Sequence, residues 1–474
     1  MTLPSRSFLN THGGNIYACL TVLLDGIVVV TAIGVGYAIN FPPFSAAPFF
    51  LHQWKLVLYS ATVLLGLSAV IGVYRRAYSC PLRLQCAAAV RAYAIGTPLI
   101  FATLFLFQNT YYSRGALLTY IVTLPALYLL SRVLLNPIRM SLHHHHWGMK
   151  RAILVHLDHG SLSPLRGPGS ITMAGFDVRA VLDMSHADDA GMGPQIMSRT
   201  SSEGATTIII DCGSLLHPRL ALLVKALVGQ PVDLRLLTPE VHDALSFMRL
   251  YDYGGIALSA SVRKESRSVY LLSKRLLDLI VSAILIVLSA PIVFVVGMAI
   301  RWESSGGVFF RQMRFLSQRS RPVRIVKFRS MDRNAGGIQP QRYGTDDHDD
   351  ASVKSRTDPR VTRVGRVIRK YSLDEIPQLY NVVTGEISLV GPRPLPLVDF
   401  GKLPPHGLLD FLLDGRTRVQ PGLTGLWQIS GRSRLSLLQM VILDLYYAEN
   451  RSFLFDLEIL FETIPAVLTG EGAY

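Results

Sequence analysis

Two adjacent carboxylates, Asp374 and Glu375, are the residues whose type and position most clearly predict chemistry. They follow a basic stretch whose cations are Lys354, Arg356, Arg360, Arg363, Arg366, Arg369 and Lys370. Opposite charges placed together keep one another ionised, so this pattern is typical of a site for a polyanion and a divalent metal. The dipole of a helix also keeps a carboxylate in its first turn ionised, which suits a nucleophile or a metal ligand.

A structural interpretation of the same segment is a capping box at the start of a helix. Ser372 would be the N-cap, and Glu375, three residues later, would return a bond to it. Pro377 is best tolerated in a first helical turn, so the helix is expected to begin a few residues later. The structural and chemical interpretations are compatible.

Separated blocks of sequence carry a resemblance to a known family. They are Lys327–Met331, Asp358–Gly365, Arg369–Pro394, Pro421–Gln428 and Gly470–Tyr474. On these blocks, about the last two hundred residues closely resemble the catalytic region of the bacterial polyprenyl-phosphate hexose-1-phosphate transferases, also called monotopic phosphoglycosyl transferases.

The resemblance implies transfer of hexose-1-phosphate from UDP-hexose, with glucose or galactose as the hexose, to undecaprenyl phosphate, with release of UMP. This would be the first membrane step of exopolysaccharide, capsule or O-antigen synthesis. In the family the first acid of the pair is the nucleophile that carries the phospho-sugar, here Asp374. The resemblance assigns Glu375 as the ligand of Mg²⁺, with Mn²⁺ as an alternative. It assigns phosphate binding to Arg369, Arg393, Lys327 and Arg329.

The composition predicts a membrane protein. Half of the 474 residues are apolar, and the mean hydropathy of +0.33 is too high for an ordinary soluble enzyme. Apolar segments of about the spanning length predict a four-helix transmembrane region over residues 1–141. These segments are Leu20–Ile39, Leu56–Val73, Ala92–Phe107 and Leu117–Leu135. Because arginines concentrate in the loop between the second and third segments and after the fourth, both ends of the bundle are expected in the cytoplasm, with the bacterial inner membrane as the location.

The net charge of +14 fits an anionic membrane surface or phosphate-bearing substrates. Nucleic acid is not an expected partner, because no binding motif is present. The four cysteines have neither metal-ligand nor redox spacing. Asp25, in the first apolar segment, is interpreted as an interfacial or helix-pairing residue. His143–His146 is interpreted as a polar run at the membrane interface, with metal binding as the less favoured alternative.

Residues 147–262 predict a Rossmann-like α/β module. Its expected strands are Ala152–Leu157, Val178–Asp183, Thr207–Asp211 and Asp233–Leu237, with a helix at Leu220–Leu227. The turn after the first strand has one glycine, so the dinucleotide fingerprint is missing. The module is therefore interpreted as structural, dimerising or regulatory.

The predicted catalytic domain covers residues 268–474 and is expected to be mostly helical. It begins with an apolar run, Leu276–Ile300, that Ser289 and Pro291 interrupt. A simple crossing would put the catalytic part outside the cell, away from nucleotide-activated sugars. A re-entrant hairpin over residues 274–301 is therefore favoured over a kinked crossing. At its start, Lys274 and Arg275 are predicted to pair with Asp278 and to hold lipid phosphate at the interface.

Further patterns predict local structure in this domain. Val323–Phe328 has the alternation of a strand, and Gly391–Pro394 is a rigid turn that presents one guanidinium. Pro421–Gln428 has the composition of a shaped loop, and Leu435–Leu468 has helical spacing with a break at Pro465. An acidic cluster around His348 is interpreted as a solvated loop.

Three rival functions are weighed against the transferase. A non-catalytic membrane scaffold is disfavoured by the intact acid pair, and a nucleotide-sugar oxidoreductase by the missing glycine-rich turn. A transporter is weaker still, because the four helices lack a convincing inward-facing polar set. The expected partners are UDP-hexose, undecaprenyl phosphate, the membrane, a second copy of the chain and downstream glycosyltransferases.

Overall fold

The computed structural model describes residues 6–41, 46–78, 82–106, 114–145, 147–158, 176–227, 229–246, 258–259, 268–331, 361–404 and 406–468. The predicted acidic loop around His348, residue Arg360 and the ending Gly470–Tyr474 lie outside these ranges. The chain divides into two compact units. One contains the helices that precede residue 152, and the other contains residues 255–474 with most of the intervening module.

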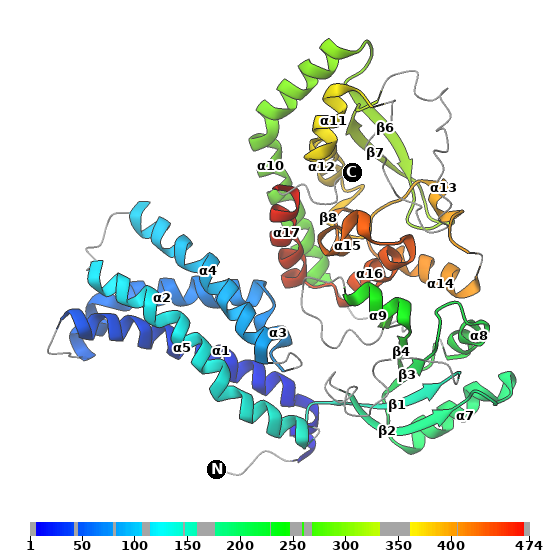
Figure 1. Cartoon of the computed structure of the whole chain (residues 1–474), viewed down its shortest axis with the longest axis horizontal. Helices are drawn as coiled ribbons and strands as arrows, with labels where there is room; N and C mark the ends of the chain where they lie inside the picture. The colour runs from blue at the N-terminus through cyan, green and yellow to red at the C-terminus, as the bar shows by residue number, and fades with distance from the viewer. Residues whose placement is uncertain are drawn as a thin grey trace. The chain divides into compact units, whose positions relative to one another are not determined.

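The first unit is a helical bundle, drawn from blue to cyan in Figure 1. Its helices are α1 (Arg6–Asn40), α2 (Ala46–Val70), α3 (Val73–Arg76), α4 (Leu82–Leu106) and α5 (Arg114–His144). The predicted apolar segments fall mainly on α1, α2, α4 and α5, and the second extends past α2 through the turn Ile71–Gly72. The helices pack through a core that includes Val29, Leu64, Ile100 and Leu124. By length and composition α1, α4 and α5 could each cross a membrane, and α2 contains a shorter apolar stretch, Trp54–Val70.

Asp25 pairs two helices of this bundle. Its carboxylate accepts two bonds from the guanidinium of Arg132 on α5, at 2.9 and 2.8 Å, and both side chains are fully buried. Tyr74 donates a third bond to Asp25 at 2.9 Å. The helix-pairing interpretation of Asp25 is therefore confirmed, in the bidentate form that a buried charge requires.

The middle module contains a five-stranded sheet in the order β2-β1-β3-β4-β5. The strands are β1 (Lys150–His156), β2 (Phe176–Asp183), β3 (Thr207–Asp211), β4 (Asp233–Leu237) and β5 (Leu258–Ser259), and the helices are α7 (Asp189–Ser202), α8 (Pro218–Leu227) and α9 (Pro239–Ser246). The four predicted strands and the predicted helix are all confirmed. β3 and β4 are parallel, as α/β connection through α8 requires, and β5 is antiparallel to β4.

The last part of the chain is mostly helical, as predicted. Its elements are α10 (Ser268–Glu303), β6 (Phe309–Arg314), β7 (Val323–Phe328), α11 (Arg363–Lys370), the 3-10 turn η2 (Leu373–Glu375), α12 (Gln378–Thr384), β8 (Ser388–Val390), α13 (Leu397–Phe400), α14 (Gly407–Arg416), β9 (Gly422–Thr424), α15 (Leu426–Ser430), η3 (Arg432–Arg434), α16 (Leu437–Asn450) and α17 (Phe453–Leu468).

Two local predictions in this part need correction. Pro421–Gln428 is not a loop, because β9 pairs with β8 in parallel and α15 follows it. The C-terminal helical run breaks between Asn450 and Phe453, whereas Pro465 lies inside α17. The predicted strand Val323–Phe328 is confirmed as β7, which pairs antiparallel with β6.

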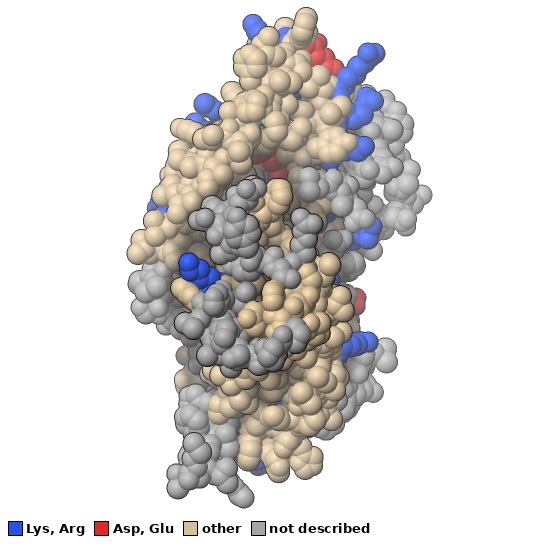
Figure 2. Space-filling model, turned by 90° about the vertical axis from the view of Figure 1, so that its left-hand side faces the viewer, with Lys and Arg blue, Asp and Glu red and all other residues tan. Residues whose placement is uncertain are grey.

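Helix α10 has an apolar surface. It is a single 36-residue helix with Pro291 inside it, and Figure 1 shows it changing direction along its length. The hydroxyl of Ser289 donates to the carbonyl of Ile286 at 3.3 Å. Large apolar side chains along the helix are exposed, among them Leu272, Ile280, Val287, Phe294 and Trp302. In Figure 2 few Lys, Arg, Asp or Glu side chains are visible among the described residues on the side that is drawn. Such a surface is suited to lipid rather than to water.

Candidate functional site

The acid pair lies in the 3-10 turn η2. The residue before this turn, Ser372, has an unusual backbone conformation. Ser372 has φ 54 and ψ 22, in the left-handed region, and Asp374 is only 7% exposed. The backbone of an N-cap residue is normally extended, whereas that of Ser372 is left-handed. The Ser372 side chain makes no capping bond, so the predicted capping box is wrong. The prediction of a later helix start is confirmed, since α12 begins at Gln378, directly after Pro377.

Glu375 is held between two cations that come from distant parts of the chain. Its Oε1 accepts from Nζ of Lys327 on β7 at 2.9 Å and from Nη2 of Arg393 at 2.9 Å. Burial opposes the charge of Arg393, but the Glu375 carboxylate outweighs this and raises the pKa of Arg393. The guanidinium also lies over the ring of Trp427, 5.5 Å from its centroid. The structure thus joins three of the predicted site residues.

The turn that presents Arg393 is fixed at both ends. At its start, the carbonyl of Val390 accepts from Nζ of Lys274 at 2.9 Å and from the hydroxyl of Tyr447 at 3.2 Å. At Arg393 itself, the carbonyl accepts from Nη2 of Arg416 at 2.6 Å. Arg416 is fully buried and forms an ion pair of 2.6 Å with Asp444. An arginine anchored in this way presents its guanidinium in a defined place.

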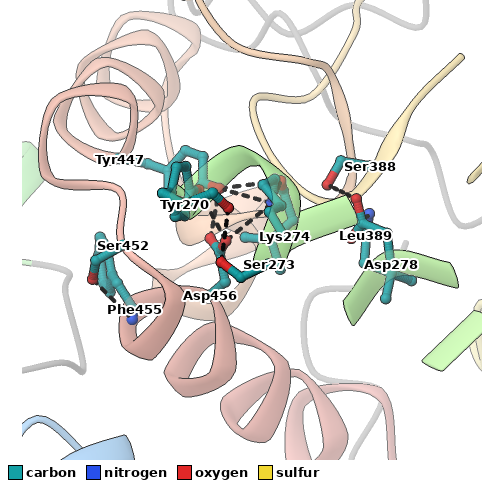
Figure 3. A network of polar contacts seen from close by, with 11 residues as sticks. Tyr270, Ser273, Lys274, Asp278, Ser388, Leu389, Tyr447, Ser452, Phe455 and Asp456 are labelled. Carbon is teal, nitrogen blue, oxygen red and sulfur yellow. Dashed lines mark hydrogen bonds and ion pairs between the residues drawn. The ribbon is translucent and has the colours of Figure 1, made fainter. Parts of the chain in front are cut away.

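A buried polar network connects α10 to this turn (Figure 3). Lys274 forms an ion pair of 3.1 Å with Oδ2 of Asp456, which also accepts from the hydroxyl of Tyr270 at 2.9 Å. Tyr447 donates to the other oxygen of Asp456 at 2.7 Å. Lys274 therefore forms its ion pair with Asp456 rather than with Asp278.

Asp278 lies one turn further along α10, at β8. Its carboxylate accepts from the hydroxyl of Ser388 at 2.7 Å and from the amide of Leu389 at 3.1 Å (Figure 3). Arg275 donates to the carbonyls of Val382 and Val383 at 2.8 and 2.7 Å, at the C-terminal end of α12. The three predicted residues, Lys274, Arg275 and Asp278, thus all bond to later elements of the catalytic part. Lipid-phosphate binding by Lys274, Arg275 and Asp278 stays a prediction.

The other two predicted phosphate-binding residues, Arg329 and Arg369, do not bond to Glu375. Arg329 donates to the carbonyls of Ser304 and Ser305, at 2.9 and 3.0 Å, and so ties the end of β7 to the segment after α10. Arg369 is partly exposed in the last turn of α11, and its carbonyl accepts from the amide of Ser372 at 3.2 Å. The structure does not bring Arg329 into the group around Glu375, and the phosphate-binding roles of both arginines stay predictions.

The sequence prediction missed Arg314 on β6. Its guanidinium donates to Oε1 of Gln312 at 3.0 and 2.7 Å. Burial and the nearby charge of Arg393 lower the pKa of Arg314 to about 10. The next residue, Phe315, pairs with Leu395, two residues after Arg393. The available signal was the alternation Phe310, Gln312, Arg314, which has the period of a strand and precedes the predicted strand Val323–Phe328.

The carboxylates of the acid pair are of a type that would suit Mg²⁺, which stays a prediction. Among the described residues no group of three or more His, Cys, Asp or Glu side chains could hold a metal by themselves. Mg²⁺ is usually held by one or two carboxylates together with substrate phosphates and water, so it requires no such group. Asp374 and Glu375 supply carboxylates of this type, at a position where the neighbouring cations favour phosphate.

Comparison with known proteins gives the site its context. Residues 269–470 match the family model described as bacterial sugar transferase. The exopolysaccharide production protein ExoY of Rhizobium meliloti is 37% identical over 207 residues, which cover 43% of this chain and 88% of that protein. The UDP-glucose:undecaprenyl-phosphate glucose-1-phosphate transferase of Caulobacter vibrioides is 36% identical over 43% of this chain and 72% of that protein. The undecaprenyl-phosphate galactose phosphotransferase of Salmonella typhimurium is 31% identical over 50% of this chain and 48% of that protein.

Proposed function

Since the chain belongs to the bacterial sugar transferase family, we propose that it transfers hexose-1-phosphate from a UDP-hexose to undecaprenyl phosphate. The relatives that are named for their reaction use a glucose or a galactose derivative and the same lipid acceptor. The observation that supports the proposal most strongly is the acid pair, with Asp374 buried and Glu375 bonded to Lys327 and Arg393, a grouping suited to an anionic diphosphate.

We assign the nucleophile to Asp374. A carboxylate oxygen of Asp374 attacks the phosphorus that bears the hexose, and the bond from that phosphorus to the UMP oxygen breaks. UMP leaves with the electron pair, and the phospho-hexose stays on the aspartate. A phosphate oxygen of undecaprenyl phosphate then attacks the same phosphorus, which breaks the aspartyl bond and gives undecaprenyl-diphospho-hexose. The intermediate allows the water-soluble donor to leave before the lipid acceptor binds.

The cations around Glu375 reduce the barrier to bringing an anionic nucleophile to an anionic diphosphate. Lys327 and Arg393 share a single oxygen of Glu375, so both can exchange a bond to it for a bond to phosphate. We propose that Glu375 with the donor phosphates holds Mg²⁺, which when bound neutralises charge that develops on the phosphoryl group. Removing metal with EDTA should abolish UMP release, and adding Mg²⁺ should restore it.

We also propose that α10 enters and leaves the membrane on the cytoplasmic face. The Ser289 hydroxyl and Pro291 would form the break, and both ends carry basic residues, Lys274 and Arg301. In a cysteine-free background, Leu272→Cys and Trp302→Cys, both at exposed positions, should react only with reagent on the cytoplasmic side. Labelling of the two cysteines from opposite sides would instead show a crossing helix.

The test of the transferase uses purified protein in detergent with labelled UDP-glucose and UDP-galactose. Without lipid, the wild type should release UMP and retain the labelled phospho-hexose on the protein, whereas Asp374→Asn should do neither. Asp410→Asn removes an exposed carboxylate on α14 and is the matched control, which should behave as the wild type. If the folded wild type releases no UMP with either donor, a non-catalytic scaffold becomes the better interpretation.

A further inference from the structure

Arg314 is a cation of the site to which the transferase proposal above assigns no role. It lies on β6, and its guanidinium contacts the neutral amide oxygen of Gln312 at 3.0 and 2.7 Å. Among the residues that the structure describes, no carboxylate lies within ion-pair distance of Arg314. A partly buried guanidinium without a bonded carboxylate is disfavoured, because desolvation opposes its charge.

The pairing of β6 with β7 places Arg314 on the face that carries Lys327. Phe310 is directly opposite Lys327, and Arg314 is opposite Val323. Opposed side chains in an antiparallel pair point to the same face, and residues two and four apart on a strand share that face. Gln312, Arg314 and Lys327 therefore line one side of the hairpin, whereas Arg311, which is opposite Val326, lies on the other side and is exposed.

Arg314 is a third cation near the group around Glu375. Lys327 and Arg393 both bond to Glu375. Phe315, the residue after Arg314, pairs with Leu395, two residues after Arg393. The charges of Arg393, Glu375 and Asp399 act on Arg314, and Asp399 itself bonds to Lys402 at 3.0 Å. The repulsion between Arg314 and Arg393 would be relieved by an anion with several acceptor oxygens, which is the chemistry of a phosphate.

We propose that Arg314 binds a substrate phosphate, with Gln312 as the residue that positions its guanidinium. The inference rests on the proposed transferase function and adds a specific residue to it. The phosphate belongs either to the diphosphate of the UDP-hexose or to undecaprenyl phosphate, and the two half-reactions separate these sources. Gln312 holds the Nε–Nη2 edge of the Arg314 guanidinium, and Nη1 would donate to the phosphate.

The experiment compares Arg314→Gln with Arg311→Gln, which removes the same charge from the opposite face of the same strand. Release of UMP without lipid reports on the donor, and transfer of preloaded phospho-hexose to undecaprenyl phosphate reports on the acceptor. Arg314→Gln should slow one of these steps by about tenfold to a hundredfold, the range for a hydrogen bond to a charged group. A slower first step identifies the donor diphosphate, and a slower second step alone identifies the lipid phosphate. Arg311→Gln should stay within about twofold, as is usual for an exposed charge.

A binding measurement separates phosphate recognition from a structural role. UDP should raise the thermal unfolding temperature of the wild type and of Arg311→Gln by the same amount. If the donor is the ligand, the shift should be lost in Arg314→Gln and reduced in Arg314→Lys, which keeps the charge and the fold but not the planar fork.

Equal rates for Arg314→Gln and Arg311→Gln in both steps would overturn the inference while leaving the transferase proposal intact. A wild type that releases no UMP would instead overturn the transferase proposal itself.

Discussion

The ammonium nitrogen of Lys274 lies 3.1 Å from Oδ2 of Asp456, which joins the long apolar helix α10 to the last helix, α17. The same ammonium donates to the carbonyl of Val390, three residues before Arg393. Because Arg393 bonds to Glu375, these bonds and the turn between Val390 and Arg393 connect α10 to the acid pair. Lys274 is therefore a positioning residue for this turn, whatever its contribution at the lipid interface.

Replacing Lys274 by methionine should destabilise the protein strongly. The change leaves the carboxylate of Asp456 buried without its cation, and removal of one partner of a buried pair typically costs about 3 to 5 kcal/mol. The double variant Lys274→Met with Asp456→Asn should recover part of the loss. Lys402→Met is the control, since its bond to Asp399 is exposed and worth less than about 1 kcal/mol. Thermal unfolding in detergent measures both effects, and similar losses for Lys274→Met and Lys402→Met would contradict the positioning role.

Two substitutions of Ser372 should have different effects on the unfolding temperature. Its left-handed backbone, φ 54, costs a non-glycine residue about 1 to 2 kcal/mol. Ser372→Gly should therefore keep or slightly raise the unfolding temperature, whereas Ser372→Val should lower it, because a β-branched residue tolerates this conformation least. Since η2 carries Asp374, the valine variant should also lose UMP release by at least about tenfold. A valine variant as active and as stable as the glycine variant would show that the backbone conformation is unimportant.

Local periodicity predicted the fold more accurately than it predicted the site. The strands β1 to β4 and β7 were found because apolar residues cluster or alternate between turn residues. The break at Pro465 was wrong because the proline is accommodated inside α17. The resemblance to a family pointed to Asp374, Glu375, Lys327 and Arg393, and the last three of these meet in space.

The partners of the site residues could not be predicted in the same way. The bonds of Lys274 to Asp456 and of Arg416 to Asp444 join positions far apart in sequence, and no local pattern specifies which buried charges meet. The pairing of β6 with β7, which puts Arg314 on the face that carries Lys327, is likewise set by tertiary register. The preference of Ser372 for a left-handed conformation comes from its surroundings, since serine has no intrinsic tendency toward it.

Protonation of the buried Asp444 should reduce the activity of the enzyme at low pH. Burial raises the pKa of its carboxyl to about 6, although the neighbouring Arg416 opposes the shift. As the pH falls from about 7 to about 5, the carboxyl takes up a proton and its bond to Arg416 weakens. Because Arg416 holds the carbonyl of Arg393, activity should fall over the same range.

The loss at low pH should not be caused by unfolding. The folded state binds this proton more readily than the unfolded chain, so the contribution of Asp444 to the free energy of unfolding rises as the pH falls through about 6. Activity should return on readjustment to about pH 7.5, and the unfolding temperature measured at each pH should show no loss in step with activity. Asp444→Asn should have a low rate that does not change between about pH 7 and about pH 5. If the rate of this variant still falls over that range, another group causes the loss of activity.

Gly391 should be intolerant of a single methyl group. A Cβ at this position would collide with the backbone carbonyl of Gln420 and with the amide of Gly422, where β8 and β9 are in contact. Neither backbone atom can move without disturbing the turn that carries Arg393. Gly391→Ala should therefore cost about 1 to 3 kcal/mol and reduce UMP release, as overpacking does in a closely packed core. Gly407→Ala is the matched control, because a Cβ there meets nothing within 4 Å, and the change should be neutral or slightly stabilising. Unfolding temperatures and initial rates of the two variants decide the point, and equal values would mean that β8 and β9 approach less closely than the structure indicates.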